Sequence, residues 1–157
     1  LDLRNNGGGY RDTAVQVLSE FLPSRQVAML EEFGDGTIQK FYTEGRGQAL
    51  EIPMVVLINE GSASASEIVA GALQDYTRAK LVGVTSYGKG SVQVWLPLDN
   101  DQGAVRVTIA RWLTPESRQI NDVGLTPDDV IEITEEQFTA GEDPQLDRAV
   151  EILLQGN

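Results

Sequence analysis

The sequence predicts an α/β domain in which helices pack against a mixed β-sheet. A continuous apolar run from Pro53 to Ile58 is typical of a central strand that is buried on both faces. Segments with helical periodicity alternate with shorter strand-like segments along most of the chain, which is the order expected of an α/β fold. With 157 residues, the chain is long enough for one domain with a hydrophobic core.

Three elements are predicted before the apolar run. Residues 11–21 form a helix, because apolar residues recur at helical spacing and Pro23 follows as a stop. Residues 26–32 and 37–43 are strand-like, and the turn residues Gly34-Asp35-Gly36 separate them. This pattern predicts a β-hairpin.

The second half of the chain continues the alternation. A helix is predicted directly after the apolar run, followed by a short strand, a hairpin around a polar turn, and a last short strand. In order, these elements cover residues 64–76, 81–84, 91–98 with 104–113, and 130–133. A final helix begins at Asp143-Pro144 and runs to about Leu154. Its packing face is predicted to comprise Leu146, Ala149, Val150 and Leu153.

The composition excludes several classes of site. The sequence has no cysteine and no histidine, so a Ser-His-Asp triad, a thiolate nucleophile and a Cys/His zinc site cannot be built within it. No cofactor is predicted. The 24 acidic and 12 basic residues give a net charge of −12, which argues against nucleic acid or an anionic membrane as partner. No apolar run is long enough to span a membrane.

Ser64 is a candidate nucleophile. It follows a buried strand and a turn of small residues, and it precedes a helix whose first N–H groups can stabilise an oxyanion. Ser64 and Glu67 also match a capping box, so the serine can equally be a helix cap. Asp75 lies about 16 Å further along the helix axis, too far to contact Ser64, and is expected to have a structural role.

A serine nucleophile needs a base, and without histidine a lysine is the strongest nitrogen candidate. Of the three lysines, Lys89 stands apart because Gly88 and Gly90 flank it, which permits a close backbone approach. Gln93 lies four residues further on, so its amide can hold an uncharged lysine amine. The alternative is an exposed lysine in a turn.

Together these motifs resemble the C-terminal processing peptidases, also called tail-specific proteases. The resemblance covers nearly the whole chain and rests on segments in a fixed order: residues 1–9 (LDLRNNGGG), 59–67 (NEGSASASE), 87–93 (YGKGSVQ), 114–115 (TP), 124–128 (GLTPD) and 143–146 (DPQL).

This resemblance implies a serine endopeptidase that cleaves substrate proteins near their C-terminus. Ser64 would be the acylated nucleophile, Lys89 the general base and Gln93 the residue that orients Lys89. The backbone N–H groups of Ala65 and Gly8 would form the oxyanion hole. The implied fold is a crotonase-like (ClpP-like) spiral core.

The resemblance also implies an organisation. Residues 1–157 would form the C-terminal part of the catalytic domain, without the first core elements and without the PDZ domain that usually selects the tail. Leu1–Leu3 indeed read as the end of a buried strand. The partners would be proteins or peptides with accessible C-terminal tails, and the location would be periplasmic or otherwise exported from a bacterial cytoplasm. A homo-oligomer is one option.

Two other hypotheses stay open. A non-hydrolytic crotonase-like domain that binds a ligand or peptide would explain the glycine-rich loop without needing a lysine beside Ser64. A catalytically silent fragment would bind peptides or subunits at its edge strands.

Overall fold

In residues 1–99 and 102–156, which the computed structural model describes, the strands form two sheets. The parallel sheet has the order β3 (Val55–Ile58), β4 (Lys80–Gly83), β7 (Asp129–Val130). The antiparallel sheet has the order β2 (Ile38–Tyr42), β1 (Val27–Phe33), β6 (Ala104–Leu113), β5 (Ser91–Pro97). The predicted α/β class is therefore confirmed, but the strands divide between two sheets rather than forming one mixed sheet.

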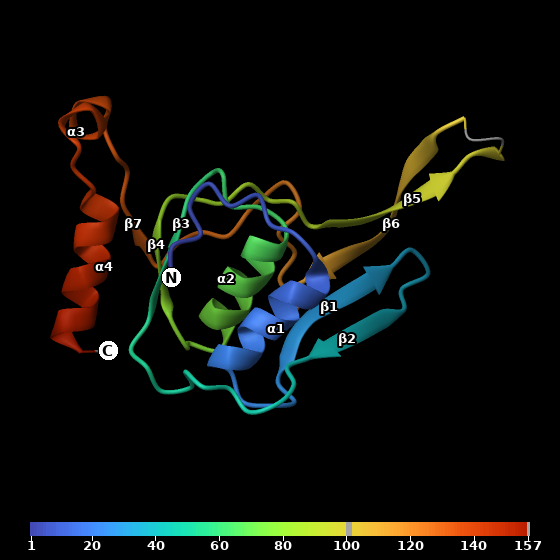
Figure 1. Cartoon of the computed structure of the whole chain (residues 1–157), viewed down its shortest axis with the longest axis horizontal. Coiled ribbons are helices and arrows are strands. Elements are labelled where there is room, and N and C mark those ends of the chain that lie inside the picture. The colour runs from blue at the N-terminus through green and yellow to red at the C-terminus, as the bar shows by residue number, and fades with distance from the viewer. Residues whose placement is uncertain (100–101, 157) are drawn as a thin grey trace.

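The helices and sheets are stacked in layers (Figure 1). Helices α1 (Arg11–Phe21) and α2 (Ala65–Asp75) pack on each other between the two sheets. Helix α4 (Pro144–Gln155) covers the other face of the parallel sheet and contacts β3 and β4. Because β3 is covered on both faces, all four of its residues are buried, as the apolar run predicts.

The two faces of β3 contribute to separate clusters of buried side chains. Val56 and Ile58 point into the main core, where they join Leu18 of α1 and Leu73 of α2. Val55 and Leu57 belong to a second cluster, which α4 closes with Ala149 and Ile152. The first cluster anchors the end of β3 and the start of α2, and this junction carries Ser64.

The packing face predicted for the last helix is largely wrong. Ala149 is buried as expected, but Leu146, Val150 and Leu153 are 39–47% exposed. The buried positions are Gln145, Ala149 and Ile152. Gln145 is drawn inward by polar contacts, because its amide nitrogen donates to the carbonyl of Ile131 and its oxygen accepts from Arg4. Apolar spacing alone does not reveal a face that is built around a buried amide.

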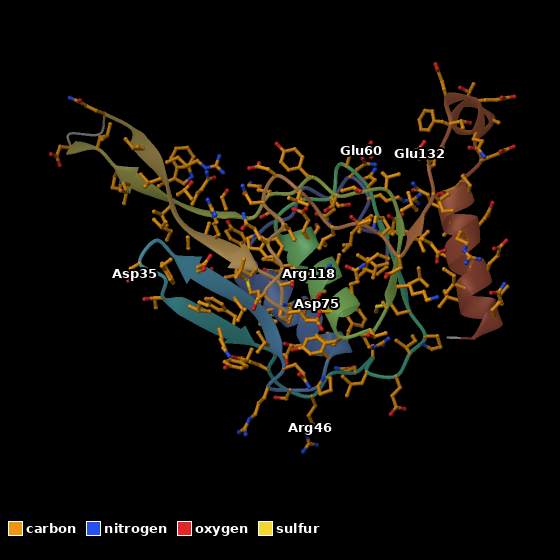
Figure 2. All side chains as sticks on the ribbon, turned by 180° about the vertical axis from the view of Figure 1, so that it is seen from behind. Asp35, Arg46, Glu60, Asp75, Arg118 and Glu132 are labelled. Carbon is orange, nitrogen blue, oxygen red and sulfur yellow. The ribbon has the colours of Figure 1, made fainter. Side chains whose placement is uncertain are left out.

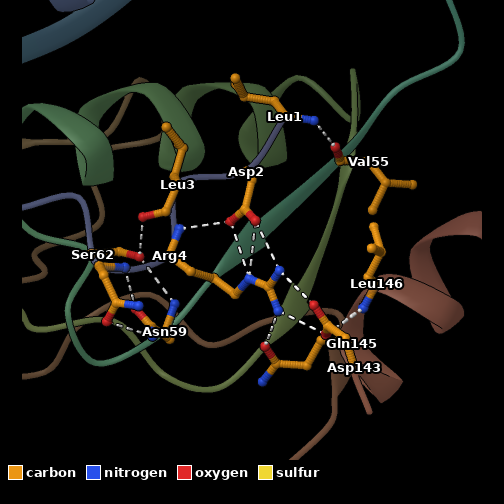
Figure 3. Close-up of polar contacts among 11 residues, drawn as sticks. Leu1, Asp2, Leu3, Arg4, Val55, Asn59, Ser62, Asp143, Gln145 and Leu146 are labelled. Carbon is orange, nitrogen blue, oxygen red and sulfur yellow. Dashed lines mark hydrogen bonds and ion pairs between the residues drawn. The ribbon is translucent and has the colours of Figure 1, made fainter. Parts of the chain in front are cut away.

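An ion-pair cluster around Arg4 ties the first residues of the chain to the start of α4 (Figure 3). The Arg4 guanidinium binds Asp2 at 2.8 Å and Asp143 at 2.8 Å. The neighbouring backbone extends the parallel sheet, because the N–H of Leu3 donates to the carbonyl of Leu57 at 2.9 Å. Residues 1–3 thus pair beside β3 as predicted, but through a single isolated bridge, and only Leu3 is buried, whereas Leu1 and Asp2 are exposed.

Most predicted boundaries agree with the structure to within a few residues. Strands β5 and β6 form the second predicted hairpin, which projects away from the body in Figure 1. Residues 100 and 101 of its predicted turn lie outside the described residues. Helix α3 (Glu135–Ala140), a short polar helix capped by Thr134, is not among the predicted elements. Across the described part of the chain, every helix is too short or too polar to cross a membrane.

Candidate active site

Ser64 occupies a strained elbow between β3 and α2. Its φ of 57° and ψ of −117° lie in a region that residues other than glycine rarely adopt, and such strain concentrates at functional sites. The turn before it is fixed by Ser62, whose buried hydroxyl donates to the carbonyl of Leu3 at 2.7 Å and accepts from the N–H of Asn59 at 3.0 Å. Ser64 itself is half-buried and lines a cavity.

Ser64 and Glu67 form a capping box at the start of α2, as the sequence predicts. The Glu67 carboxylate accepts the backbone N–H of Ser64 at 2.8 Å, which is the glutamate's part of a capping box. The Ser64 side chain faces the N–H of Glu67 and completes the box, while that N–H donates its 2.9 Å hydrogen bond to the backbone carbonyl of Ser64. Ser64 therefore lies both at the start of the helix and in the wall of the cavity.

Glu67 is fully buried and connects the elbow to the loop that carries Lys89. Its Oε2 accepts from the N–H groups of Ser64 and Lys89, at 2.8 and 2.9 Å. Its Oε1 accepts from the Ser86 hydroxyl and the Gly88 N–H, both at 2.6 Å. A buried carboxylate is tolerated only with such partners, so these contacts hold the two loops at a fixed separation.

The glycines beside Lys89 are required by close packing, as the sequence suggests. A Cβ on Gly88 would lie 2.8 Å from the backbone nitrogen of Gly124, and one on Gly90 would lie 2.8 Å from Asn121. Gly88 also has a φ of +85°. The carbonyl of Lys89 accepts from the indole N–H of Trp112 at 2.8 Å, so the loop is anchored on both sides.

Ser64, Lys89 and Gln93 line the same cavity, which has a volume of about 230 Å³. Its wall includes the buried side chains of Met29, Ile68 and Trp112. Gln93 is exposed, and its amide nitrogen donates to the hydroxyl of Thr108 at 3.2 Å. The structure thus brings the three predicted side chains to one cleft, while the Gln93 amide nitrogen contacts Thr108 rather than Lys89.

The predicted oxyanion donors differ in availability. Ala65 is the first residue of α2, and within residues 1–99 and 102–156 its N–H has no hydrogen-bond acceptor. Gly8 lies against the elbow, but its N–H donates to the side chain of Asn6 at 3.0 Å. Gly9, the next residue, lines the cavity with Ser64 and Ala65.

A second cavity of about 490 Å³ shares Lys89, Ser91 and Gln93 with the first. A larger cleft of about 960 Å³ lies elsewhere, between the Arg4 cluster and α3. Glu60, Glu132 and Glu142 contribute to its acidic wall, and neither Ser64 nor Lys89 reaches it. We place the candidate chemistry in the cavity of about 230 Å³, because it combines a strained serine, a lysine and a backbone N–H at the start of a helix.

Sequence reasoning missed two features of this site. Glu67 was recognised only as a helix cap, and its contacts to the Lys89 loop depend on the return of the chain after β4. Arg106 of β6 lines both cavities beside Lys89. The residues around it in the sequence predict only a strand of a hairpin and give no sign of a site. Pairing of β5 with β6 brings Arg106 to both cavities.

The chain is similar to known proteases over most of its length. The sequence pattern of Peptidase family S41 matches residues 1–131. A carboxy-terminal-processing protease of Bartonella bacilliformis is 46% identical, over 84% of this chain and 30% of its own length. A carboxyl-terminal-processing protease of Synechocystis sp. is 39% identical, over 99% of this chain and 36% of its own length.

Solved structures agree with these relatives. The photosystem II D1 C-terminal processing protease superposes with a TM-score of 0.78 at 37% identity, covering 84% of this chain and 34% of that one. A putative peptidase from Parabacteroides merdae has a TM-score of 0.80 at 23% identity, over 98% of this chain and 50% of that one, which shows the shared fold. The chain spans about a third of the length of the curated relatives in this comparison. The match to the family pattern over more than half the chain shows that this protein belongs to peptidase family S41.

Proposed function

We propose that this chain carries the catalytic residues of a serine endopeptidase that cleaves protein substrates near their C-terminus. The observation that carries the proposal is the Glu67 carboxylate, which binds the backbone N–H groups of both Ser64 and Lys89. This contact fixes a serine and a lysine beside one cavity in a chain of 157 residues that contains no histidine. Membership of the family and the names of the relatives support the same reaction class.

In the proposed mechanism, the uncharged amine of Lys89 takes the proton of the Ser64 hydroxyl while Oγ attacks the scissile carbonyl carbon. The resulting oxyanion accepts hydrogen bonds from the N–H of Ala65 and from a glycine of the Gly7–Gly9 loop. Lys89 then gives its proton to the leaving amine, and the C–N bond breaks. Water, deprotonated by Lys89, hydrolyses the acyl-serine ester and restores both groups.

Gln93 and Gly8 keep the roles implied by the family resemblance, each with a condition. Gln93 would orient the Lys89 amine through its amide oxygen, since its nitrogen donates to Thr108. Gly8 would serve as the second oxyanion donor once its N–H leaves Asn6. The wider proposal includes a crotonase-like spiral core, of which residues 1–157 form the C-terminal part, an exported location, and substrates with accessible C-terminal tails.

The test is peptide cleavage by the full-length protein with Ser64→Ala and Lys89→Ala. Ser24→Ala and Lys80→Ala are matched controls, because both residues are exposed and line neither cavity beside Lys89. We expect each active-site variant to lose at least about a thousandfold in kcat, as when a catalytic nucleophile or base is removed. A fluorophosphonate probe should label the wild type and not Ser64→Ala. Unchanged cleavage in the active-site variants would refute the proposal.

The alternative of a catalytically silent peptide-binding domain predicts a different pattern. Peptides would bind to the wild type and to Ser64→Ala with equal affinity, and neither protein would be labelled by the probe.

A further inference from the structure

Arg106 lies at the meeting point of the two cavities that flank Lys89. It is on β6, directly opposite Trp95 on β5, and its guanidinium carbon lies 5.9 Å from the centre of the Trp95 ring. Both cavities include Arg106, Lys89, Ser91 and Gln93 in their walls. Any substrate that passes Lys89 from one cavity to the other therefore passes the Arg106 side chain.

The positive groups in these cavities have different partners. The Arg11 guanidinium is bound to Asp12 at 2.9 Å and to Glu31 at 3.0 Å, so its charge is already neutralised. Lys89 is the proposed base and works in its uncharged form. In the part of the chain that the structure describes, Arg106 has no carboxylate within ion-pair distance.

Among residues 1–99 and 102–156, Arg106 forms no ion pair, although the chain has a net charge of −12 and Asp122 lines one of the same two cavities. An arginine that rests over an aromatic ring keeps its planar face covered while the N–H groups at its edge stay free. Those N–H groups form a fork that matches the two oxygens of a carboxylate. Trp95 is itself 66% exposed, so the pair is open to a ligand from solvent.

We propose that Arg106 binds a carboxylate of the peptide substrate and thereby selects which bond is cleaved. This inference rests on the proposed peptidase function. The pairing of β5 with β6 places Arg106 relative to Gln93. Gln93 lies opposite Thr108, and Trp95 lies opposite Arg106. Arg106 is therefore two strand residues from Gln93 toward the tip of the hairpin, on the same face of the sheet as Thr108. Two residues of strand span about 7 Å, and Gln93 lines the same cavity as Ser64, so we place the carboxylate about two residues from the substrate residue that lies beside Gln93 at the scissile bond.

Such a carboxylate has two sources in a peptide. It is either the free α-carboxylate at the chain end or the side chain of an aspartate or glutamate. The chemistry that Arg106 recognises is the same in both cases, and matched peptides separate them. One pair ends two residues after the scissile bond in either a free carboxylate or an amide. The other pair carries Glu or Gln at that distance within a longer peptide.

The experiment compares kcat/KM for these peptides in the full-length wild type, Arg106→Gln and Arg106→Lys. Arg111→Gln is the control, because Arg111 lies on the same strand and lines neither cavity. We expect the wild type and Arg111→Gln to favour the carboxylate form of at least one pair by about five- to tenfold, a modest factor for an exposed charged contact. Arg106→Gln should remove this preference, and Arg106→Lys should retain only part of it.

Binding in a Ser64→Ala background provides a readout that does not need turnover. Dissociation constants of fluorescent versions of the same peptides should show the same preference, and the preference should weaken at high salt. Equal preference in Arg106→Gln and wild type, or no preference in the wild type, would overturn the inference. If instead Ser64→Ala cleaves peptides like the wild type, the proposed peptidase function fails, whatever the Arg106 variants do.

Discussion

The backbone N–H of Lys89 donates a hydrogen bond of 2.9 Å to the carboxylate of Glu67. The same oxygen accepts the N–H of Ser64, so one atom in the first turn of α2 holds the two residues of the candidate dyad in place. The side chains of Ser64 and Lys89 stay free of this contact, because only their backbones are used. Glu67 therefore positions the site without consuming its reactive groups.

Replacing Glu67 by Gln should damage both stability and activity. In the wild type, each carboxylate oxygen of Glu67 accepts two hydrogen bonds. In the glutamine side chain, an NH₂ group replaces one of these oxygens, so two of the four donors would face another donor instead of an acceptor. We expect a loss of about 2–5 kcal/mol in the free energy of unfolding, as for a broken buried charged network. Urea unfolding measures this loss, and peptide cleavage should fall as well.

Glu60→Gln is the control for this prediction, because Glu60 is exposed and lies only a few residues away. It should unfold within about 0.5 kcal/mol of the wild type. If Glu67→Gln matched Glu60→Gln in both assays, the view of Glu67 as the connection between the two loops would be wrong.

Gly8 should not tolerate a side chain, whereas Gly7 should. A Cβ on Gly8 would lie 2.5 Å from the carbonyl oxygen of Ala63 and 2.7 Å from the nitrogen of Ala65, and its φ is +90°. Gly7 has no atom within 4 Å of its Cβ position. We expect Gly8→Ala to destabilise the fold by about 1–3 kcal/mol and to shift the elbow at Ser64. Thermal unfolding and fluorophosphonate labelling of both variants test this, and equal behaviour would contradict it.

The sequence predicted those parts of the fold whose cause is local. The run that forms β3, the turn of the first hairpin and the proline after α1 act over a few residues, and the structure agrees with each of these predictions. The sequence predicts Ser64 and Lys89 as partners because the glycines around Lys89 signal a close approach and the chain has no histidine to act as base, and the structure places both residues in the wall of one cavity. That signal identifies the residues without giving the distance between their side chains.

Features that depend on distant contacts were missed. The buried face of α4 depends on Gln145, whose partners Arg4 and Ile131 come from other parts of the chain. The division of the strands into two sheets depends on how the second hairpin pairs with β1 through β6, and residue spacing does not specify that pairing.

Asp75 and Arg118 should stabilise the fold as a pair. The helical spacing predicts that Asp75 lies too far from Ser64 for contact and has a structural role. The structure agrees, because Asp75 forms an ion pair with Arg118, and both residues are labelled in Figure 2. The second carboxylate oxygen of Asp75 accepts the N–H of Glu116 at 2.8 Å. The Asp75 side chain is 2% exposed and that of Arg118 is 40% exposed.

A double-mutant cycle of Asp75→Asn and Arg118→Met tests this pair in urea unfolding. Because solvent reaches the arginine, we expect a coupling free energy of about 1–2 kcal/mol rather than the larger value of a fully buried pair. Additive effects of the two substitutions would show that the ion pair contributes nothing of its own.

The Arg4 cluster should make the protein sensitive to acid. Hydrogen bonds from the Arg4 guanidinium hold the pKa values of Asp143 and Asp2 below their ordinary value of 3.8. A carboxyl group with a lowered pKa in the folded state binds protons less readily than it does in the unfolded chain. Its stabilisation is therefore complete above about pH 4 and is lost as the pH falls through the lowered pKa.

The variant Arg4→Met isolates this effect. At pH 7 its melting temperature should lie below that of the wild type, because the two carboxylates and the amide of Gln145 lose their shared partner. As the pH falls below about 4, the difference should shrink, since the carboxylates that Arg4 binds become protonated. Arg46→Met, at an exposed arginine, should differ little from the wild type at any pH. A difference for Arg4→Met that stays constant down to pH 2 would mean that Arg4 stabilises the fold through packing of its side chain and not through the charges of Asp2 and Asp143.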